Sequence, residues 1–149
     1  MNIQSFIIIN GKDYLLPCLL SHRPLDTVIL MLGTNDLKAY FNLPPASIAF
    51  GVRQLVWTIR SIFPKTETDV LVVSPPVARS GIEVWSGLFD ETSIKKSHQL
   101  ATAYEEVARY EDCHFLDANQ FAEFPEKDGI HLDAQGQKIL GESIANLLK

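Results

Sequence analysis

Two short, continuous apolar runs constrain the fold of this chain more than any other feature of its sequence. They span residues 27–32 and 69–73, and both are rich in β-branched and aliphatic side chains. Neither run shows the alternation of apolar and polar residues that is typical of a half-exposed strand. Each is therefore predicted to form a strand that is buried on both faces, as in a parallel sheet. Shorter strands are predicted at residues 6–9 and 114–116.

Segments with helical periodicity lie between these predicted strands. They span residues 13–21, 47–63, 94–110 and 133–148. Ser47 and Asp133 are candidate N-caps for two of them, whereas Pro17 weakens the prediction for the first. Strands that alternate with amphipathic helices predict a parallel sheet with helices on both faces. We therefore expect residues 1–149 to form a single α/β domain.

Composition and charge exclude several classes of protein. The 149 residues include 13 Lys and Arg against 18 Asp and Glu, and no basic run is present. This balance argues against nucleic acid or an anionic membrane surface as a partner. The apolar runs are too short to span a bilayer, and the sequence does not start like a secretory signal, so a soluble, cytoplasmic protein is expected.

The two cysteines, Cys18 and Cys113, stand far apart and form no Cys-x-x-Cys motif. We interpret them as buried thiols in a reducing compartment, and the alternatives are a disulfide or a shared metal ion. We expect no cofactor and no bound metal.

The first candidate functional motif is Gly33-Thr34-Asn35-Asp36, directly after the first buried run. Ligands of parallel sheets bind outside the carboxyl ends of the strands, and Gly33 allows the chain to turn sharply there. The amide of Asn35 offers N–H donors that can stabilise an oxyanion. The same residues are also compatible with a simple turn, in which Asn35 and Asp36 cap the backbone.

The second candidate motif places Asp128 three residues before His131, just ahead of the last predicted helix. A carboxylate that accepts the proton of one ring nitrogen fixes the tautomer and leaves the other nitrogen free as a base. The alternative is a surface turn that precedes a helix capped by Asp133. The pair supplies two members of a catalytic triad and lacks the nucleophile.

Together, the segments 28–36 and 128–132 resemble the third and fifth sequence blocks of the SGNH, or GDSL-type, hydrolases. Asn-Gly-Lys-Asp-Tyr-Leu at 10–15, Ser-Pro-Pro at 74–76 and Asp-Ala-Gln-Gly at 133–136 are similar to the arylesterase-like branch of that family. The resemblance implies a three-layer α/β/α sandwich with a mostly parallel, flavodoxin-like sheet.

The resemblance also implies hydrolysis of a small carboxylic ester or thioester. It assigns His131 as the base, Asp128 as the carboxylate that orients it and Asn35 as an oxyanion donor, with Gly33 shaping the turn. The Val-Trp-Ser-Gly-Leu-Phe segment at 84–89 is interpreted either as the lining of an acyl pocket or as a short lid.

The chain departs from the family pattern at its N-terminal end. Family members begin with a strand that ends in Gly-Asp-Ser-Leu, which carries the nucleophile, and a following block supplies a glycine oxyanion donor. Neither occurs in this sequence, and Ser5 precedes its apolar run instead of following it. Ser74 and Ser80 lack the sharp strand-to-helix turn that exposes a nucleophile, so structural roles are expected for both.

We therefore expect an N-terminally shortened hydrolase domain with little or no esterase activity. The alternative is a non-catalytic domain that binds a partner or forms oligomers. In the family's strand order the missing strand lies beside residues 27–32, and an open apolar edge there invites pairing. Either residues 5–9 fill the vacant position, or two copies pair edge to edge as a homo-oligomer.

Overall fold

The computed structural model describes residues 11–85 and 87–149, and within them three parallel strands form one sheet in the order β1-β2-β3. Val28 of the first strand pairs with Val70, and Val72 pairs with Phe115 of the third strand. The strand predicted at residues 6–9, and with it Ser5, lies outside the described residues. The strands are β1 (Thr27–Leu30), β2 (Asp69–Ser74) and β3 (His114–Asp117).

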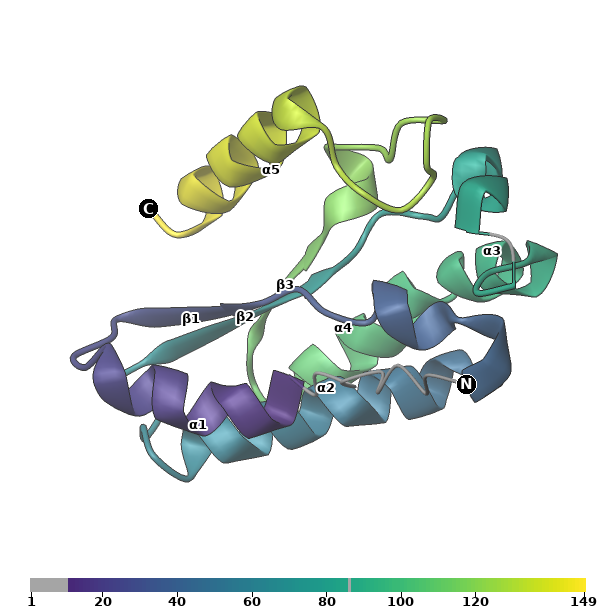
Figure 1. Cartoon of the computed structure of the whole chain (residues 1–149). Coiled ribbons are helices and arrows are strands. Elements are labelled where there is room, and N and C mark those ends of the chain that lie inside the picture. Colours follow the sequence, from purple (N-terminus) through teal and green to yellow (C-terminus); the bar gives the residue numbers. More distant parts are fainter. Residues whose placement is uncertain (1–10, 86) are drawn as a thin grey trace.

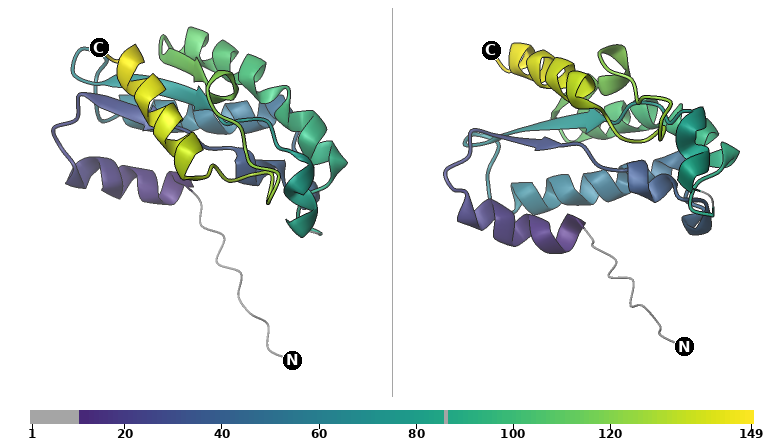
Figure 2. Two further views of the ribbon diagram at one scale, coloured as in Figure 1. Left: turned by 90° about the horizontal axis from the view of Figure 1, so that it is seen from above. Right: turned by 45° about the horizontal axis from the view of Figure 1, so that its top comes forward.

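Helices cover both faces of this sheet, so the structure has the three layers that the sequence predicts (Figures 1 and 2). α1, α2 and α4 lie on one face, α5 lies on the other, and α3 lies beyond the carboxyl ends of the strands. No helix in the described ranges is long and apolar enough to cross a membrane. The helices are α1 (Gly11–Ser21), α2 (Pro45–Arg60), α3 (Glu91–Ser97), α4 (Leu100–Tyr110) and α5 (Ala134–Leu147).

The side chains of β2 alternate between two apolar cores. Val70 and Val72 belong to the main core with residues of α1, α2 and α4, whereas Leu71 and Val73 belong to a second core with Leu140 of α5. All four are fully buried. This alternation follows from the two-residue period of a strand and confirms the prediction that residues 69–73 are covered on both faces.

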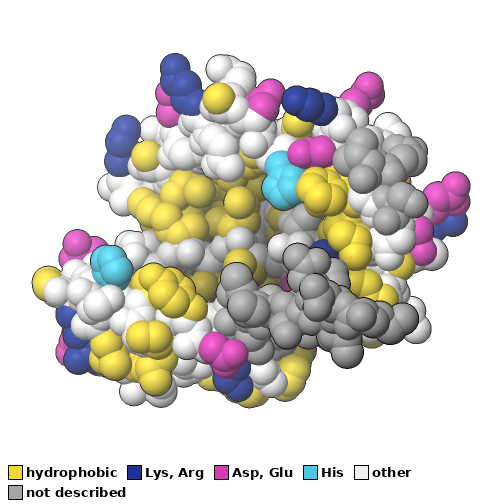
Figure 3. Space-filling model, viewed as in Figure 1, with side chains coloured by type: hydrophobic (Ala, Val, Ile, Leu, Met, Phe, Trp, Pro, Cys, Tyr) yellow, Lys and Arg dark blue, Asp and Glu magenta, His cyan; other side chains and the backbone are white. Residues whose placement is uncertain are grey.

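The edge strand β1 does not follow that prediction. Val28 and Leu30 are buried in the main core, but Ile29, on the opposite face, is 45% exposed, as is Leu32 just beyond the strand. The prediction of burial on both faces is therefore wrong for β1 in the described structure. The physical reason is that α5 covers only part of this face of the sheet. Only Gly136 and Leu140 of this helix are buried. Figure 3 shows apolar side chains in the hollow between α5 and α1.

Several helix boundaries differ from the sequence prediction. The segment 94–110 forms two helices instead of one, because α3 ends at Ser97 and α4 begins at Leu100. A capping box on Asp90 starts α3 three residues earlier than the apolar periodicity indicates. The predicted cap Ser47 is also wrong, because it lies inside α2.

Two prolines determine where α2 starts, and Asp133 determines where α5 starts. Pro44 is the N-cap of α2 and Pro45 is its first residue, where a fixed φ suits the first helical turn. Asp133 caps α5 as predicted, and its carboxylate accepts a hydrogen bond of 2.7 Å from the backbone N–H of Gly136. Pro17 lies within α1 and does not end that helix.

Candidate active site

Three loops meet at the carboxyl ends of the parallel strands (Figure 1). The first carries the Gly33 turn into a short 3-10 helix, η1 (Thr34–Leu37). The second leads from β2 into another 3-10 helix, η3 (Ser80–Trp85), and the third carries the turn at 128–131. Because the strands are parallel, residues that are far apart in sequence come to the same edge of the sheet, as predicted.

The structure pairs Asp128 with His131 in the predicted way. Nδ1 of His131 lies 3.0 Å from Oδ2 of Asp128. The other carboxylate oxygen, Oδ1, accepts backbone N–H bonds from Ile130 and His131, each of 3.0 Å. The carboxylate is therefore held on both oxygens, and within the described residues Nε2 of His131 has no hydrogen-bond partner. The imidazole is 62% exposed and can reach a ligand.

These contacts also control the charge of Asp128. Desolvation by burial is the largest single effect and raises the pKa of this carboxyl group. It is outweighed by the backbone N–H groups of Ile130 and His131 and by the imidazole of His131, which together lower the pKa below its ordinary value of 3.8. Asp128 is therefore ionised at neutral pH, as an orienting carboxylate must be.

Gly129 allows the loop at 128–131 to pack closely against the segment that follows β2. Its φ is +73°, a left-handed conformation that favours glycine. A Cβ at this position would lie 2.5 Å from the carbonyl oxygen of Arg79. The backbone N–H of Arg79 in turn donates a 3.0 Å hydrogen bond to the carbonyl of Gly129. The two loops are thus joined through their backbones.

Trp85, the last residue of η3, lies against the same pair. Its Nε1–H donates a 3.2 Å hydrogen bond to the carbonyl oxygen of Asp128, and its ring centroid lies 5.6 Å from that of His131 in an edge-to-face arrangement. The sequence indicated only that the segment 84–89 lines a pocket or forms a lid. The one sequence feature that could have indicated this contact is a tryptophan in a loop at the carboxyl edge of the predicted sheet.

The Gly33 turn is shaped by a residue for which the sequence predicted only a place in the helical segment 94–110. The hydroxyl of Tyr104, on α4, donates a 2.7 Å hydrogen bond to the carbonyl of Leu32. Gly33 has φ +120°, and a Cβ there would lie 2.0 Å from that hydroxyl oxygen. Burial, with a smaller contribution from the charge of Asp36, raises the pKa of Tyr104, so the phenol remains a hydrogen-bond donor. The predicted role of Gly33 in this turn has a clear physical basis.

Asn35 is exposed on η1, and in the described part of the chain its side chain makes no hydrogen bond. It therefore does not cap the backbone, and its amide N–H groups remain available to a ligand. No hydrogen bond joins it to His131. Beside it, desolvation raises the pKa of Asp36, although the backbone N–H of Asp36 and the charge of Lys38 oppose this shift.

The described residues place no serine hydroxyl within hydrogen-bonding distance of His131. Ser74 is buried at the end of β2, and its hydroxyl is 3.4 Å from the carbonyl oxygen of Pro75. Ser80 is exposed at the start of η3. The structural role expected for Ser74 agrees with its burial, which keeps it away from any substrate.

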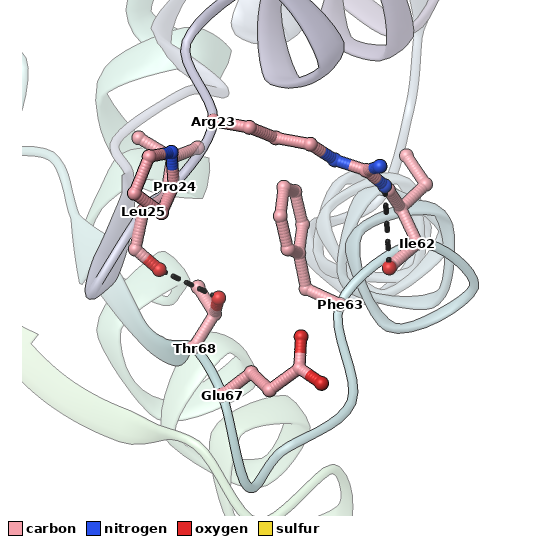
Figure 4. A pocket seen from close by; sticks show the side chains of 7 residues that line it. All are labelled: Arg23, Pro24, Leu25, Ile62, Phe63, Glu67 and Thr68. Carbon is pink, nitrogen blue, oxygen red and sulfur yellow. Dashed lines mark hydrogen bonds between the residues drawn. The ribbon is translucent and has the colours of Figure 1, made fainter.

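A cavity of about 220 Å³ lies at the opposite end of the sheet, beside the first residues of β1 and β2 (Figure 4). Its polar groups stabilise the fold, because Thr68 donates to the carbonyl of Leu25 at 2.7 Å and Arg23 lies 4.8 Å above the ring of Phe63. It is remote from the loops that carry Asp128 and His131, so we do not assign it to the candidate active site.

The family model described as GDSL-like lipase/acylhydrolase matches residues 10–139. The chain belongs to this family. The match covers both the Gly33 turn and the Asp128–His131 pair, so the two motifs lie in the family's own sequence context. Among proteins with curated descriptions, none matches the chain of this GDSL-like protein.

Solved structures confirm the family and its fold. A carbohydrate acetylesterase from Sinorhizobium meliloti is 35% identical, with a TM-score of 0.85, over 99% of this chain and 71% of that one. The inhibitor-bound aryl esterase of M. smegmatis gives the same four values. A second carbohydrate acetylesterase family member from S. meliloti is 30% identical, with a TM-score of 0.85, over 93% of this chain and 67% of that one. The GDSL-like chain thus has the predicted α/β fold of the arylesterase-like branch and is shorter than these neighbours.

Proposed function

We propose that this GDSL-like chain acts on small carboxylic esters or thioesters through His131. The observation that carries the proposal is the 3.0 Å contact between Nδ1 of His131 and the ionised Asp128, with Nε2 left free. In the proposed roles, His131 is the base, Asp128 orients it, and Asn35 donates to the developing oxyanion from the turn that Gly33 shapes. The names of the neighbouring acetylesterases and aryl esterase support an ester substrate.

In the proposed step water is the nucleophile, since the described residues place no serine hydroxyl beside His131. Nε2 of His131 removes a proton from water as its oxygen bonds to the acyl carbon. Asp128 stabilises the imidazolium, and the amide of Asn35 donates to the carbonyl oxygen as negative charge develops. The bond to the leaving alkoxide or thiolate then breaks, and Nε2 returns the proton to it. Without a serine and its backbone oxyanion donor, we expect slow turnover.

Hydrolysis of p-nitrophenyl acetate tests this proposal. The unmodified chain is expected to hydrolyse the ester slowly, at least about tenfold faster than His131→Ala, because general base catalysis is lost with the imidazole. Asp128→Asn is expected to lower the rate as well. His98→Ala is the matched control, because His98 is exposed at the end of α3 and lies outside the site. It should leave the rate unchanged.

A non-catalytic role is the second candidate function, and two observations favour it. The printed residues contain no Gly-Asp-Ser segment, and β1 has an exposed apolar face at Ile29. In this alternative the hydrolase fold persists as a binding or oligomerising domain. Equal ester hydrolysis by the unmodified chain and by His131→Ala would favour it over the enzyme.

We further propose that copies of this chain associate through the edge of β1 as a homo-oligomer. In the described sheet β1 has β2 on one side and no strand on the other. The unpaired N–H and C=O groups of an edge strand are a template for another strand. Ile29 and Leu32, each 45% exposed, add an apolar surface beside these groups that association would bury.

A further inference from the structure

Trp85 contacts both members of the Asp128–His131 pair, through two different parts of its side chain. The indole N–H holds the backbone carbonyl of Asp128 at 3.2 Å, while the aromatic ring lies edge-to-face with the imidazole of His131 at 5.6 Å. The ring is itself half-buried and packs against the main core. One rigid side chain therefore connects the turn at 128–131 to the body of the protein.

The backbone around Trp85 also connects this turn to the loop of Asn35. The carbonyl of Trp85 accepts a 2.8 Å hydrogen bond from the N–H of Leu88, and the carbonyl of Leu88 accepts one of 2.8 Å from Ala39, just beyond η1. At the other end of the segment, Arg79 is hydrogen-bonded to Gly129. Arg79, Trp85 and Leu88 thus contact both loops that carry the candidate catalytic groups.

The imidazole of His131 needs such support because the ring itself is mostly exposed. A solvent-exposed histidine samples several rotamers and both neutral tautomers, and only the one with its proton on Nδ1 facing the carboxylate leaves Nε2 free as a base. Asp128 supplies the acceptor. Trp85 fixes the turn from which that acceptor projects and restricts the imidazole on one side.

We propose that Trp85 is a positioning residue that holds His131 in the rotamer and tautomer in which Nδ1–H faces Asp128 and Nε2 is free. The inference deepens the proposed function, because it concerns how the proposed base is prepared. Trp85 itself takes no part in proton transfer. Its contribution is to make one arrangement of the imidazole more populated than the others.

The test compares Trp85→Phe with Trp57→Phe in the full chain. The first substitution keeps an aromatic ring and removes the N–H donor, and the second makes the same chemical change at an exposed tryptophan on α2. The readout is the ¹⁵N chemical shifts of Nδ1 and Nε2 of His131 in the neutral imidazole, which report the ratio of the two tautomers directly. Circular dichroism confirms that each variant is folded.

We expect Trp85→Phe to lower the ratio of the Nδ1–H to the Nε2–H tautomer about two- to fivefold, because the lost hydrogen bond fixes the turn that carries Asp128 and does not itself contact the imidazole. Trp57→Phe should leave the ratio unchanged. Asp128→Asn is the positive control, because it removes the carboxylate that selects the tautomer. A ratio in Trp85→Phe equal to that of the unmodified chain would overturn the proposal.

This readout does not depend on catalysis. If ester hydrolysis is independent of His131 while the tautomer ratio still responds to Trp85→Phe, the proposed function fails and the positioning role stands. If hydrolysis depends on His131 and the ratio does not respond, the proposed function stands and the positioning role is wrong.

Discussion

At the scale of single residues, Gly33 and Tyr104 show how one turn at the candidate site depends on a residue from a distant helix. The Tyr104 hydroxyl occupies the space where a Cβ of residue 33 would lie, and it satisfies the carbonyl of Leu32. The turn therefore combines a left-handed backbone with a close side-chain contact, and both require glycine. Gly33 of the GDSL-like motif therefore determines the shape of this turn.

Gly33→Ala is expected to destabilise the fold by about 3 kcal/mol, because it adds both backbone strain and a clash with the Tyr104 hydroxyl. Tyr104→Phe alone should cost about 1 to 3 kcal/mol, since it leaves the carbonyl of Leu32 without its partner. Urea unfolding of both variants and of the double variant separates the two causes. The free energy of unfolding should fall less in the double variant than the sum of its losses in the two single variants, because the clash with the hydroxyl is gone. Strict additivity would contradict this explanation.

The sequence separation of the contacting residues decides which site residues could be predicted. Asp128 and His131 are three residues apart, so their contact is a local property that spacing predicts. Gly33 could be inferred because it follows a buried strand directly. Trp85 and Tyr104 reach the site from other segments, and these contacts depend on tertiary packing that no short motif records.

Among the elements, α5 combines little buried surface with a side-chain N-cap. Only Gly136 and Leu140 of its residues are buried, so little apolar packing holds it against β2 and β3. Its first turn is fixed by the carboxylate of Asp133. This turn also follows directly from His131 and Leu132, so the cap lies next to the candidate site.

Asp133→Ala is expected to lower the free energy of unfolding by about 1 kcal/mol, the usual cost of removing a side-chain N-cap. Thermal unfolding followed by circular dichroism measures this change. Asp133→Asn is the matched control, because asparagine caps helices about as well as aspartate. Equal losses in the two variants would show that the charge matters and the hydrogen bond does not.

The sequence predicted the order of the elements better than their ends. The apolar runs located β1, β2 and β3, and helical periodicity located α2 and α5. The ends depend on individual capping residues, and at α2 a proline pair determines the start in place of Ser47. The division of residues 94–110 depends on the Asp90 capping box, which periodicity does not detect.

At the scale of the whole molecule, the two faces of the sheet differ in how well they are packed. The main core with α2 and α4 is large, whereas the second core beneath α5 leaves Ile29 exposed. The sequence predicted equal burial because β1 and β2 are similarly apolar. Burial depends on what packs over a strand, and the strand's own composition does not contain that information.

Sedimentation velocity tests whether copies of the chain use the exposed edge. We expect a dimer or larger assembly, and Ile29→Lys should shift it towards monomer, because a charged side chain on an edge strand opposes pairing. Phe50→Lys on α2 is the matched control, since Phe50 is also exposed and lies away from β1. A clean monomer of the unmodified chain would exclude association through this edge.

In the proposed mechanism His131, held by Asp128, acts as a base in a hydrolase fold. The most direct test is the ratio of the rate of p-nitrophenyl acetate hydrolysis by the unmodified chain to that by His131→Ala. We expect a slow reaction whose rate falls at least about tenfold in the variant. Equal rates for the two proteins would contradict it.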